Sequence, residues 1–509
     1  MPTLFRGKSA EYKVILVLVA VIIILAAVLG PVLSLGGQAA AQSAPLDWRR
    51  IATARGDRFP DFSFAGYHAS NMSLPAADSA PKVTLQTSGK DQTRQIQQAL
   101  NQTASAGGGV VLLGEGNFTI SSGIFVPSNV TLRGSGSART MIVSTEEGPT
   151  EPIITLGTPE SGRGPVDELA RANILDEYVP IGTAVLNVDN ATGFAVGQTV
   201  MVNRAVTAEW VRANGMADLV RDGVQQTWIE PGKLVQHPSI IASIAGNQIN
   251  LTIPLTDSLD AEYMSPYLTA YTPPQPASEI GIEQLSLSLA TSCSGTAVSN
   301  STCNAAAISF PSWTVDSWAR DLTLQNFNTF ISVAYNASRI TLQNVAMYRD
   351  ADVTGVALPA DISITGSQVL VQDCAQQGIP AARSFAVMTG SLAPGPNAVR
   401  RHITRSTSQS IYPHQRWATG MLVEDTDVAV LFVNRGIKGS GHGWSMNAGV
   451  GWNLRGPASF ESPPLGVNWC VGYTGVGGAG AKGNGTFIES GFSVSPESLF
   501  QAQLEARGL

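Results

Sequence analysis

Charged side chains are scarce in this chain of 509 residues. Lys, Arg, Asp and Glu together make up 14% of it, against about a quarter in an average soluble domain. Disordered chains combine high charge with low hydrophobicity, whereas 44% of these residues are hydrophobic, so we expect a large folded core. The net charge is −7, and no basic run occurs beyond the extreme N-terminus. Nucleic-acid binding needs clustered Lys and Arg, so the sequence predicts no nucleic-acid partner.

Cysteine is also rare, with four residues and no C-x-x-C pair of the kind that binds zinc. Cys293 and Cys303 bracket a polar loop, and we predict a disulfide between them in an oxidising compartment. Cys374 and Cys470 stand in apolar, strand-like surroundings and are predicted to be buried free thiols. Calcium would need several clustered oxygen ligands, and no dense acidic group supports such a site, so no cofactor is predicted.

The chain has one long apolar run, from Val14 to Leu29, with three basic residues before it and Ala39–Ala41 after it. This pattern is typical of a secretory signal, and Ala39–Ala41 fits a cleavage site. The run also approaches the length of a membrane span. We therefore predict that residues 1–41 are either a cleaved signal peptide or an uncleaved signal-anchor. In both cases the body is secreted or faces the outside, and the membrane is a partner only through this segment.

Sequons for N-glycosylation agree with that compartment. N-x-S/T motifs without a central proline occur at nine asparagines. They are Asn71, Asn101, Asn117, Asn129, Asn190, Asn250, Asn300, Asn336 and Asn484.

A helix followed by short strands is predicted near residue 90. Asp91 suits a helix N-cap, and Ile96, Ala99 and Leu100 form an apolar stripe at helical spacing. The glycines at 107–109 end that helix, and short apolar strands follow at 110–113 and 130–133. A capping helix that leads into short, regularly spaced strands is typical of the start of a β-helix.

After residue 280 a short alternating strand that ends in Asn or Asp recurs. Its alternation turns one face to a core, and the terminal Asn or Asp suits a left-handed turn position. At about 20–30 residues per coil, the range 280–480 predicts roughly eight coils. The repeats are 322–326, 340–344, 369–373, 421–425 and 431–434.

The motifs at 91–100, 107–111 and 130–134 resemble the opening of the pectate lyase superfamily, and residues 280–480 share its style of repeat. A later block at 412–420, 434–444 and 453–469 resembles secreted β-helix proteins of the same superfamily. The resemblance implies a right-handed parallel β-helix and a protein that acts on polysaccharide. The fold is shared by lyases, hydrolases, epimerases and tailspike domains, so it does not fix the reaction.

The sequence therefore predicts an all-β fold, a right-handed parallel β-helix solenoid with an N-terminal capping helix, a small inserted β module and a C-terminal helical cap. Alternating strands separated by turns predict the inserted module, and Ser495 followed by Pro496 predicts the start of the cap helix. The predicted segments are 1–41 signal or anchor, 42–80 extended N-terminal segment, 81–177 start of the β-helix, 178–256 inserted module, 257–485 main coils and 486–509 cap.

Three of only five histidines fall within residues 402–442, together with several arginines. Coils one turn apart stack, so these residues are expected to converge on one face. The predicted catalytic residues are Tyr412, His414, Arg416 and His442. The predicted substrate-binding residues are Arg401, His402, Trp417, Asn434, Arg435 and Trp444.

This set suits β-elimination on a uronate-containing glycan. A neutral histidine, His414 or His442, takes the proton next to the carboxylate. Arg416, Arg435 or Arg401 binds the carboxylate, Tyr412 donates a proton to the leaving oxygen, and tryptophans pack on sugar faces. We expect a polysaccharide lyase acting on a polysaccharide substrate.

Two alternatives stay open at this stage. A glycoside hydrolase needs two facing carboxyl groups, and its candidates are Asp350, Asp352, Asp373, Glu424 and Asp425, of which Asp373 and Asp425 stand at turn positions. A non-catalytic carbohydrate-binding protein at the cell surface would explain an uncleaved anchor and the inserted module.

Overall fold

The structure is a computed structural model that describes residues 44–509 except 147–150, 291–305, 350–357 and 476–481. Residues Pro45–Leu509 form one unit. The predicted signal or anchor at 1–41 and the predicted Cys293–Cys303 disulfide lie outside the described residues. Within the described part of the chain, no helix is both long enough and apolar enough to cross a bilayer.

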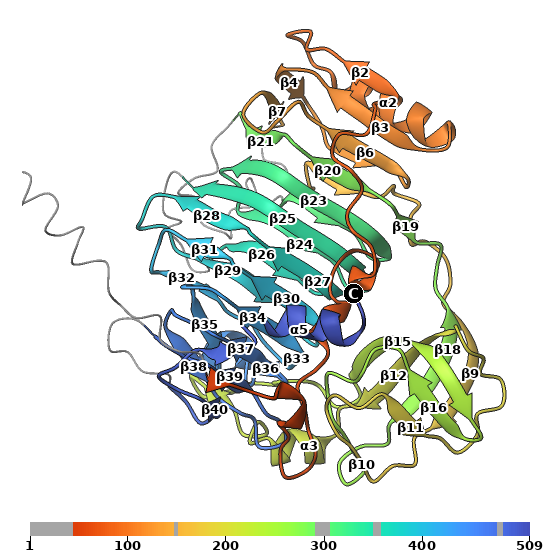
Figure 1. The fold of residues 1–509 in the computed structure, drawn as a ribbon, viewed down its shortest axis with the longest axis vertical. Coiled ribbons are helices and arrows are strands. Elements are labelled where there is room, and N and C mark those ends of the chain that lie inside the picture. Colours follow the sequence, from red (N-terminus) through yellow and green to blue (C-terminus); the bar gives the residue numbers. More distant parts are fainter. Residues whose placement is uncertain (1–43, 147–150, 291–305, 350–357, 476–481) are drawn as a thin grey trace, which may run out of the picture. The chain divides into compact units, whose positions relative to one another are not determined.

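Parallel strands stack into three sheets that wind around a common core, as in a β-helix (Figure 1). The first sheet contains β2 (Val83–Leu85), β3 (Gly109–Leu113), β6 (Val130–Arg133), β20 (Gly281–Glu283), the first half of β23 (Thr314–Gln325), the first half of β25 (Ser338–Arg349), β27 (Ser367–Gln372), β30 (Asn397–Arg400), β34 (Met421–Glu424), β37 (Val450–Trp452), β39 (Trp469–Val471) and β40 (Thr486–Ile488). Strand β19 (Ala277–Ser278) pairs with the start of β23.

The other two sheets run beside the first. The second contains β4 (Gly116–Ile120), β7 (Thr140–Ser144), β21 (Ser286–Leu289), the later halves of β23 and β25, β28 (Ala375–Gly378) and β31 (Ile403–Thr404). The third contains β5 (Ile124–Val126), β8 (Ile154–Leu156), β22 (Ala306–Phe310), β24 (Thr329–Val333), β26 (Ala360–Ile364), β29 (Ser384–Thr389), β32 (Gln409–Ile411), β35 (Ala429–Phe432) and β38 (Ala458–Phe460).

The predicted coil count is confirmed. Within the described residues between 280 and 480, the first sheet contributes one strand per coil: β20, β23, β25, β27, β30, β34, β37 and β39.

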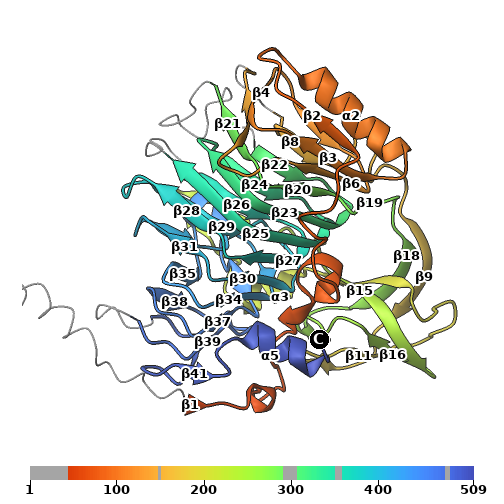
Figure 2. The same ribbon diagram turned by 45° about the horizontal axis from the view of Figure 1, so that its top comes forward.

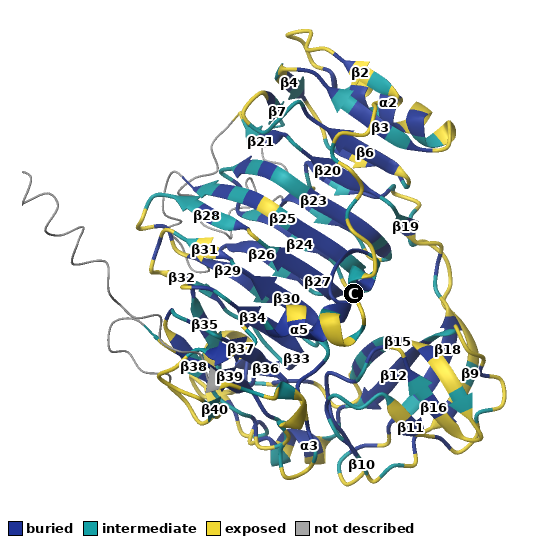
Figure 3. Cartoon of the chain, viewed as in Figure 1, coloured by how far each residue is buried: buried dark blue, intermediate teal, exposed yellow. Residues whose placement is uncertain are grey.

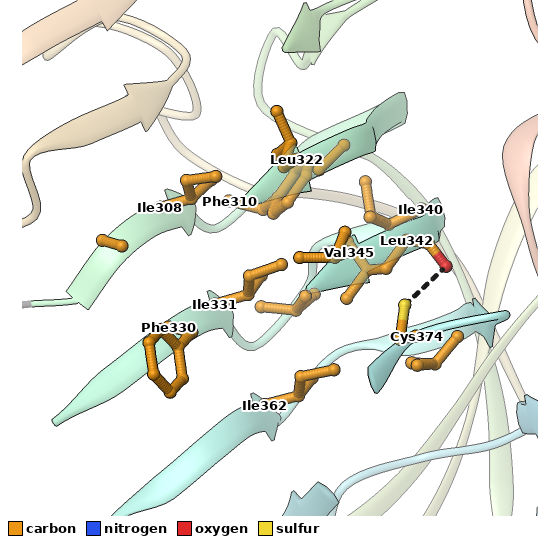
Figure 4. Close-up of a cluster of buried hydrophobic side chains, with 14 of the residues drawn as sticks. Ile308, Phe310, Leu322, Phe330, Ile331, Ile340, Leu342, Val345, Ile362 and Cys374 are labelled. Atoms are coloured by element: carbon orange, nitrogen blue, oxygen red, sulfur yellow. Dashed lines mark hydrogen bonds between the residues drawn. The ribbon is translucent and has the colours of Figure 1, made fainter. Parts of the chain in front are cut away.

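Each sheet is in register, so equivalent apolar positions stack along the coils. Leu342 pairs with Val371, Val371 with Val399, and Val399 with Val423, and all four side chains are buried. Phe310, Phe330 and their neighbours fill the interior from the third sheet (Figure 4). This continuous column of buried side chains is what the alternation predicted.

The predicted turn role of Asn and Asp is also confirmed. Asn326, Asn344, Asp373 and Asp425 have φ values of 64°, 52°, 56° and 51°. Asn and Asp tolerate this left-handed backbone better than other residues with a side chain. Asn434 differs, because its Oδ1 instead accepts the N–H of Gly436 at 2.8 Å.

Both end helices are present. Helix α2 (Thr93–Ser105) buries Ile96, Ala99 and Leu100 as predicted, with Gln92 rather than Asp91 at the N-cap position. The side chain of Asp91 still accepts the N–H of Thr93 at 3.0 Å. Helix α5 (Leu499–Ala506) begins later than predicted. Ser498, not Ser495, is its N-cap, and the side chain of Ser498 accepts the N–H of Gln501.

An antiparallel module interrupts the coils between β8 and β19 (Figures 1 and 2). Its sheet runs in the order β11 (Val185–Asn187), β16 (Gln248–Leu251), β15 (Leu234–Ala245), β12 (Thr199–Ala205), β18 (Tyr267–Thr272), β9 (Asp167–Asn173). The module also carries α3 (Ala208–Ala213) and the short strands β10 (Tyr178–Val179), β13 (Val220–Arg221), β14 (Val224–Gln225) and β17 (Leu259–Asp260). Its strands therefore reach from 167 to 272, beyond both ends of the predicted range 178–256.

The outer face of the first sheet is covered by the two ends of the unit. The N-terminal segment forms three short 3₁₀ turns, η1 (Trp48–Arg50), η2 (Phe62–Phe64) and η3 (Tyr67–Ser70). Phe59, Phe62 and Phe500 pack with Trp452 and Trp469 of the sheet, and all five side chains are buried. Figure 3 shows that strands β27, β30 and β34 of this sheet are largely buried. A ligand therefore has no access to this part of the sheet face, and the loops at the coil edges are the accessible places.

Candidate functional site

Two loops that lead from the third sheet back to the first carry most of the predicted site residues. One covers residues 412–417, between β32 and β33 (Ala418–Thr419). The other covers residues 433–445, between β35 and β36 (Met446–Asn447), and includes the short turn α4 (Lys438–Gly441). The loops stack like strands, since the N–H of Arg416 donates to His442 O at 3.1 Å and that of Trp417 to Trp444 O at 2.8 Å.

This stacking gathers Tyr412, His414, Arg416, Arg435 and His442 into one group, called here the His414 cluster. The rings of His414 and His442 lie 4.7 Å apart at 79°. The guanidinium of Arg435 lies 4.8 Å from the centre of the Tyr412 ring, and its Nη1 donates to His414 O at 2.6 Å. Two imidazoles, one guanidinium and a phenol are therefore in contact, and the charge of the second guanidinium, Arg416, acts on both imidazoles. The sequence predicted that these five residues converge on one face.

The two arginines of the His414 cluster have no acidic partner. Among the described residues, no carboxylate lies within ion-pair distance of Arg416 or Arg435. Arg416 donates Nη2 to the carbonyl and hydroxyl oxygens of Ser440, and the Nε atoms of both arginines are buried without a hydrogen-bond acceptor. Guanidiniums that lack a carboxylate offer a place for an anion, and a carboxylate is the anion whose shape they fit.

Burial and the two arginines keep both histidines neutral. The pKa of His414 is lowered to about 4, first by burial and then by the charges of Arg435 and Arg416. The pKa of His442 is also lowered to about 4, by burial and by Arg435, His414 and Arg416. Each imidazole therefore has a free ring nitrogen at neutral pH, as a general base requires.

The pKa of the Tyr412 phenol is shifted in the opposite direction. Burial raises its pKa, although the neighbouring Arg435 partly opposes the effect. Tyr412 therefore stays protonated at neutral pH and has a proton to donate.

An open cavity of about 630 Å³ adjoins the cluster. Its lining includes Asn434, Arg435, Lys438, Trp444 and Glu461. Arg435 thus belongs both to the cluster and to an accessible surface, so a solute that enters the cavity reaches the cluster.

The other predicted residues lie in three different places. Arg401 forms a bidentate ion pair with Asp373 at 2.6 and 2.7 Å, at a corner of the coils. His402 is wholly buried in the coils, and neither of its ring nitrogens has a partner among the described residues. Asn434 holds the loop, because its N–H donates to Glu461 Oε2 at 2.6 Å. The structure does not bring Arg401 or His402 to the His414 cluster.

Trp417 and Trp444 bind the inserted module to the coils. Trp417 is buried edge-on against Trp210 at 4.7 Å and Trp228 at 5.7 Å. The indole N–H of Trp444 donates to Asn214 O at 2.9 Å. These tryptophans fix the loops that carry the cluster, and they do not form an exposed platform for sugar.

Sequence reasoning missed two residues beside the cluster. Glu230 of the inserted module acts electrostatically on Arg416, and Ser440 accepts hydrogen bonds from Arg416 through its side chain and its carbonyl. Glu230 precedes Arg416 by nearly two hundred residues and stands in a separate module, so no local pattern connects them.

One group of side chains has the composition of a metal site. Ligand atoms of His68, Glu279 and Asp316 all lie within 4.8 Å of one another. Their bonding is already saturated, since His68 Nε2 lies 2.7 Å from Glu279 Oε1 and Asp316 accepts two hydrogen bonds from Arg339. We therefore assign no metal to this group.

The buried histidine of the coils makes a testable contribution to acid sensitivity. Burial lowers the pKa of His402 to about 4 from 6.5, so between these pH values the unfolded chain binds more protons than the folded chain. Stability is then lost as pH falls from about 6.5 to about 4, by up to about 3 kcal/mol for this residue. His402→Leu is expected to remove that part of the pH dependence, measured by urea unfolding at a series of pH values.

The control for this prediction is Ile403→Leu, which changes the exposed next residue, the first of β31. Wild type and the control should lose stability in parallel on acidification, while His402→Leu loses less. Identical pH dependence in all three proteins would show that His402 is not kept neutral by the fold.

The chain was compared with known families and structures. Residues 85–233 match the family model described as rhamnogalacturonase A/epimerase, pectate lyase-like. No match was found among curated proteins.

Several solved structures share the coiled fold at low identity. ORF18 of Geobacillus virus E2 is 12% identical with a TM-score of 0.33, and the match covers 79% of this chain and 59% of that one. PfbA, a surface adhesin of Streptococcus pneumoniae, is 11% identical with a TM-score of 0.39 and covers 78% and 76% of the two chains. The tailspike of E. coli bacteriophage HK620, solved with a pentasaccharide, is 10% identical with a TM-score of 0.37. That match covers 86% of this chain and 62% of the tailspike. We draw no functional conclusion from likeness at this level.

The match to the family model starts within β2, the first strand of the first sheet, and includes α2 and the first coils. The predicted resemblance rested on motifs in that same stretch. The chain is thus a parallel β-helix protein with a pectate-lyase-like domain.

Proposed function

We propose that the chain is an extracellular polysaccharide lyase that cleaves a uronate-containing glycan by β-elimination at the His414 cluster. The observation that carries the proposal is the pair of guanidiniums, Arg416 and Arg435, that have no carboxylate partner within the described part of the chain and lie beside two neutral imidazoles. A uronate supplies the missing carboxylate, and the acidic proton next to it is the one that a lyase removes.

The reaction follows from these groups. Arg416 and Arg435 bind the carboxylate and stabilise the negative charge that develops on it when the adjacent C–H bond breaks. A ring nitrogen of His414 takes the proton, and the electron pair of the C–H bond forms the new C=C bond. The bond to the leaving oxygen breaks with its electron pair, and Tyr412 gives its proton to that oxygen. The product carries an unsaturated uronate at its new end.

We assign the base to His414 because it is the more exposed of the two histidines, while His442 is 8% exposed. His442 is a positioning residue. Its ring packs edge-on against His414 and closely against Gly439, where an added Cβ would lie 2.0 Å from Nε2. This contact fixes the direction of the His414 ring.

Substrate binding also strengthens the base. The positive charges of Arg435 and Arg416 contribute to the low pKa of His414. A bound carboxylate compensates those charges, so the pKa of His414 rises toward its ordinary value when substrate is present. The base is then a better proton acceptor in the complex than in the free protein.

Surface features support an extracellular location. The sequon asparagines Asn101, Asn117, Asn129, Asn190 and Asn484 are exposed, as glycan attachment requires.

The proposal is tested by incubating the full-length protein with a panel of polyuronates and following the ultraviolet absorbance of unsaturated products. We expect one or more substrates to give a rising signal whose rate Arg416→Gln lowers by a factor of about 10² or more without abolishing it. The matched control is Arg455→Gln, because Arg455 pairs with Asp425 and Asp427 at another corner of the coils and should leave the rate unchanged. No signal on any polyuronate would refute the lyase.

The acid limb of the pH profile gives a second prediction. With a base of pKa about 4, kcat/KM of the free enzyme should fall as pH drops through about 4, because the imidazole becomes protonated. Arg416→Lys keeps the positive charge that lowers the pKa of His414, whereas Arg416→Gln removes it. The residual activity of Arg416→Gln should therefore show its acid limb at higher pH than that of Arg416→Lys. A limb at the same pH in both variants would show that Arg416 does not act on the base.

A glycoside hydrolase is the second candidate, and two carboxylates favour it. Glu230 acts electrostatically on Arg416 and Glu461 acts on Tyr412, so acidic groups approach the cluster from two sides. In this alternative they would serve as the acid and the base, and reducing ends would appear without any unsaturated product.

A further inference from the structure

A second cavity, of about 760 Å³, lies where three parts of the unit meet. Strands β12 and β15 of the inserted module form one wall, and the coil corners that begin β23, β25 and β27 form another. The third wall is the N-terminal segment around η3. None of the residues of the His414 cluster lines this cavity.

Aromatic side chains form much of the wall. Tyr271 and Trp313 lie with ring centres 6.4 Å apart, and Tyr335 is 39% exposed. The hydroxyl of Tyr335 donates to Gln236 of the inserted module, so its ring is held in place. Trp313 has a φ of 65°, a backbone conformation that costs energy in a residue with a large side chain and is common at binding sites. Trp313 and Tyr335 are partly exposed, whereas Tyr271 is buried. Partly exposed, fixed aromatic rings suit the apolar C–H faces of sugars.

The charged groups at this cavity are paired or saturated. Arg339 donates Nε and Nη2 to Asp316 at 2.6 and 2.8 Å. His68 lies 2.7 Å from Glu279 Oε1. Arg507 directs Nη1 to Ser63 and Ala69 carbonyl oxygens and Nη2 to Asn71. In the His414 cluster, in contrast, neither guanidinium is paired with a carboxylate of the residues that the structure describes.

Uncharged hydrogen-bonding groups remain for a ligand with hydroxyls. Gln368 lines the cavity and donates its Nε2 to Phe64 O at 3.0 Å. Ser338 and Asn336 add further polar groups at the same corner. Fixed rings, neutral polar groups and compensated charges together match a neutral sugar and not a uronate.

We propose that this cavity binds neutral saccharide residues, at a site separate from the His414 cluster. Here Trp313 and Tyr335 pack against the sugar rings, and Asn336 and Ser338 bond to hydroxyls. The site has no role in bond cleavage. It depends on the proposed function only for the class of ligand, since binding here needs no residue of the lyase mechanism.

The test measures binding by titration calorimetry with three probes, the linear hexasaccharides of glucose, galactose and mannose. The full-length chain is produced in a bacterial host, because Asn71 and Asn336 both line the cavity within N-x-S motifs and must carry no glycan. We expect at least one probe to bind. Tyr335→Ala should raise its Kd about tenfold or more through loss of the ring contact.

Two further variants keep the result interpretable. Tyr335→Phe retains the ring and should bind within about twofold of wild type, which separates loss of the ring from loss of folding. Tyr267→Ala changes a tyrosine of the inserted module outside the cavity and should leave Kd unchanged. Absence of binding by all three probes, or equal affinity of Tyr335→Ala and wild type, would overturn the proposal. The absorbance assay on polyuronates reports independently on the lyase, so failure of one leaves the other in place.

Discussion

Replacing His414 with glutamine is expected to lower kcat on a polyuronate by a factor of about 10²–10⁴, the usual contribution of a general base. Glutamine keeps a polar side chain but has no basic nitrogen, so the C–H bond loses its proton acceptor. His442→Gln should lower kcat by less, because His442 orients the base without touching the reacting atoms. The measurement is the initial rate of unsaturated product under saturating substrate.

The control for His414→Gln is His402→Leu, which changes a histidine wholly enclosed by the coils. It should retain wild-type kcat. If His414→Gln also retains wild-type kcat, another group is the base and the assignment fails. If both variants lose activity together, the loss reflects damage to the coils.

Asp257→Asn is expected to destabilise the protein by about 3–5 kcal/mol, as removal of one member of a buried ion pair does. Asp257 accepts Arg204 Nε at 2.8 Å and Asn447 Nδ2 at 2.9 Å, and it lies 3.2 Å from the indole nitrogen of Trp417. It therefore links the inserted module to the first site loop through Trp417 and, through Asn447, to β36, which follows the second loop. Arg204 is 1% exposed, so its charge would stay buried without compensation. Urea unfolding followed by tryptophan fluorescence measures the change.

Asp427→Asn provides the matched control. Asp427 pairs with Arg455 at 2.6 Å, and their side chains are 70% and 43% exposed. Exposed pairs contribute about 0–1 kcal/mol, so this variant should unfold close to wild type. Equal effects of the two substitutions would show that Asp257 does not anchor the module.

Much of the fold was predictable because its signals are local. The stripe of Ile96, Ala99 and Leu100 specifies the cap helix, and each alternating strand specifies its inner face. The left-handed turns at Asn344 and Asp373 follow from the residue type itself. Because the coils stack in register, these local features repeat along the whole solenoid.

The site was predictable only in part, since stacking says which loops are neighbours but not where each side chain lies. Tyr412, His414, Arg416, Arg435 and His442 come together as expected, because their loops follow one another on successive coils. Arg401 and His402 belong to the same stretch of sequence, but they stand at a corner and in the interior of the coils.

Contacts between the module and the coils could not be read from the sequence at all. Trp417 packs against Trp210 and Trp228, which are more than 180 residues earlier in the chain. Because the sequence does not reveal this contact, the position of Trp417 in an aromatic-rich block suggested that it binds sugar. Glu230 and the second cavity could not be predicted for the same reason, because the residues that meet there are far apart in the sequence. The walls of the cavity come from three distant segments.

The central claim is that the His414 cluster cleaves a uronate glycan by elimination, and the mass of the products tests it most directly. Mass spectrometry of fragments released from the best polyuronate should show new ends that are one water molecule lighter than hydrolysis products. That species should be absent with His414→Gln. Fragments that all carry an added water would contradict the account and favour the pair of Glu230 and Glu461 as hydrolytic groups.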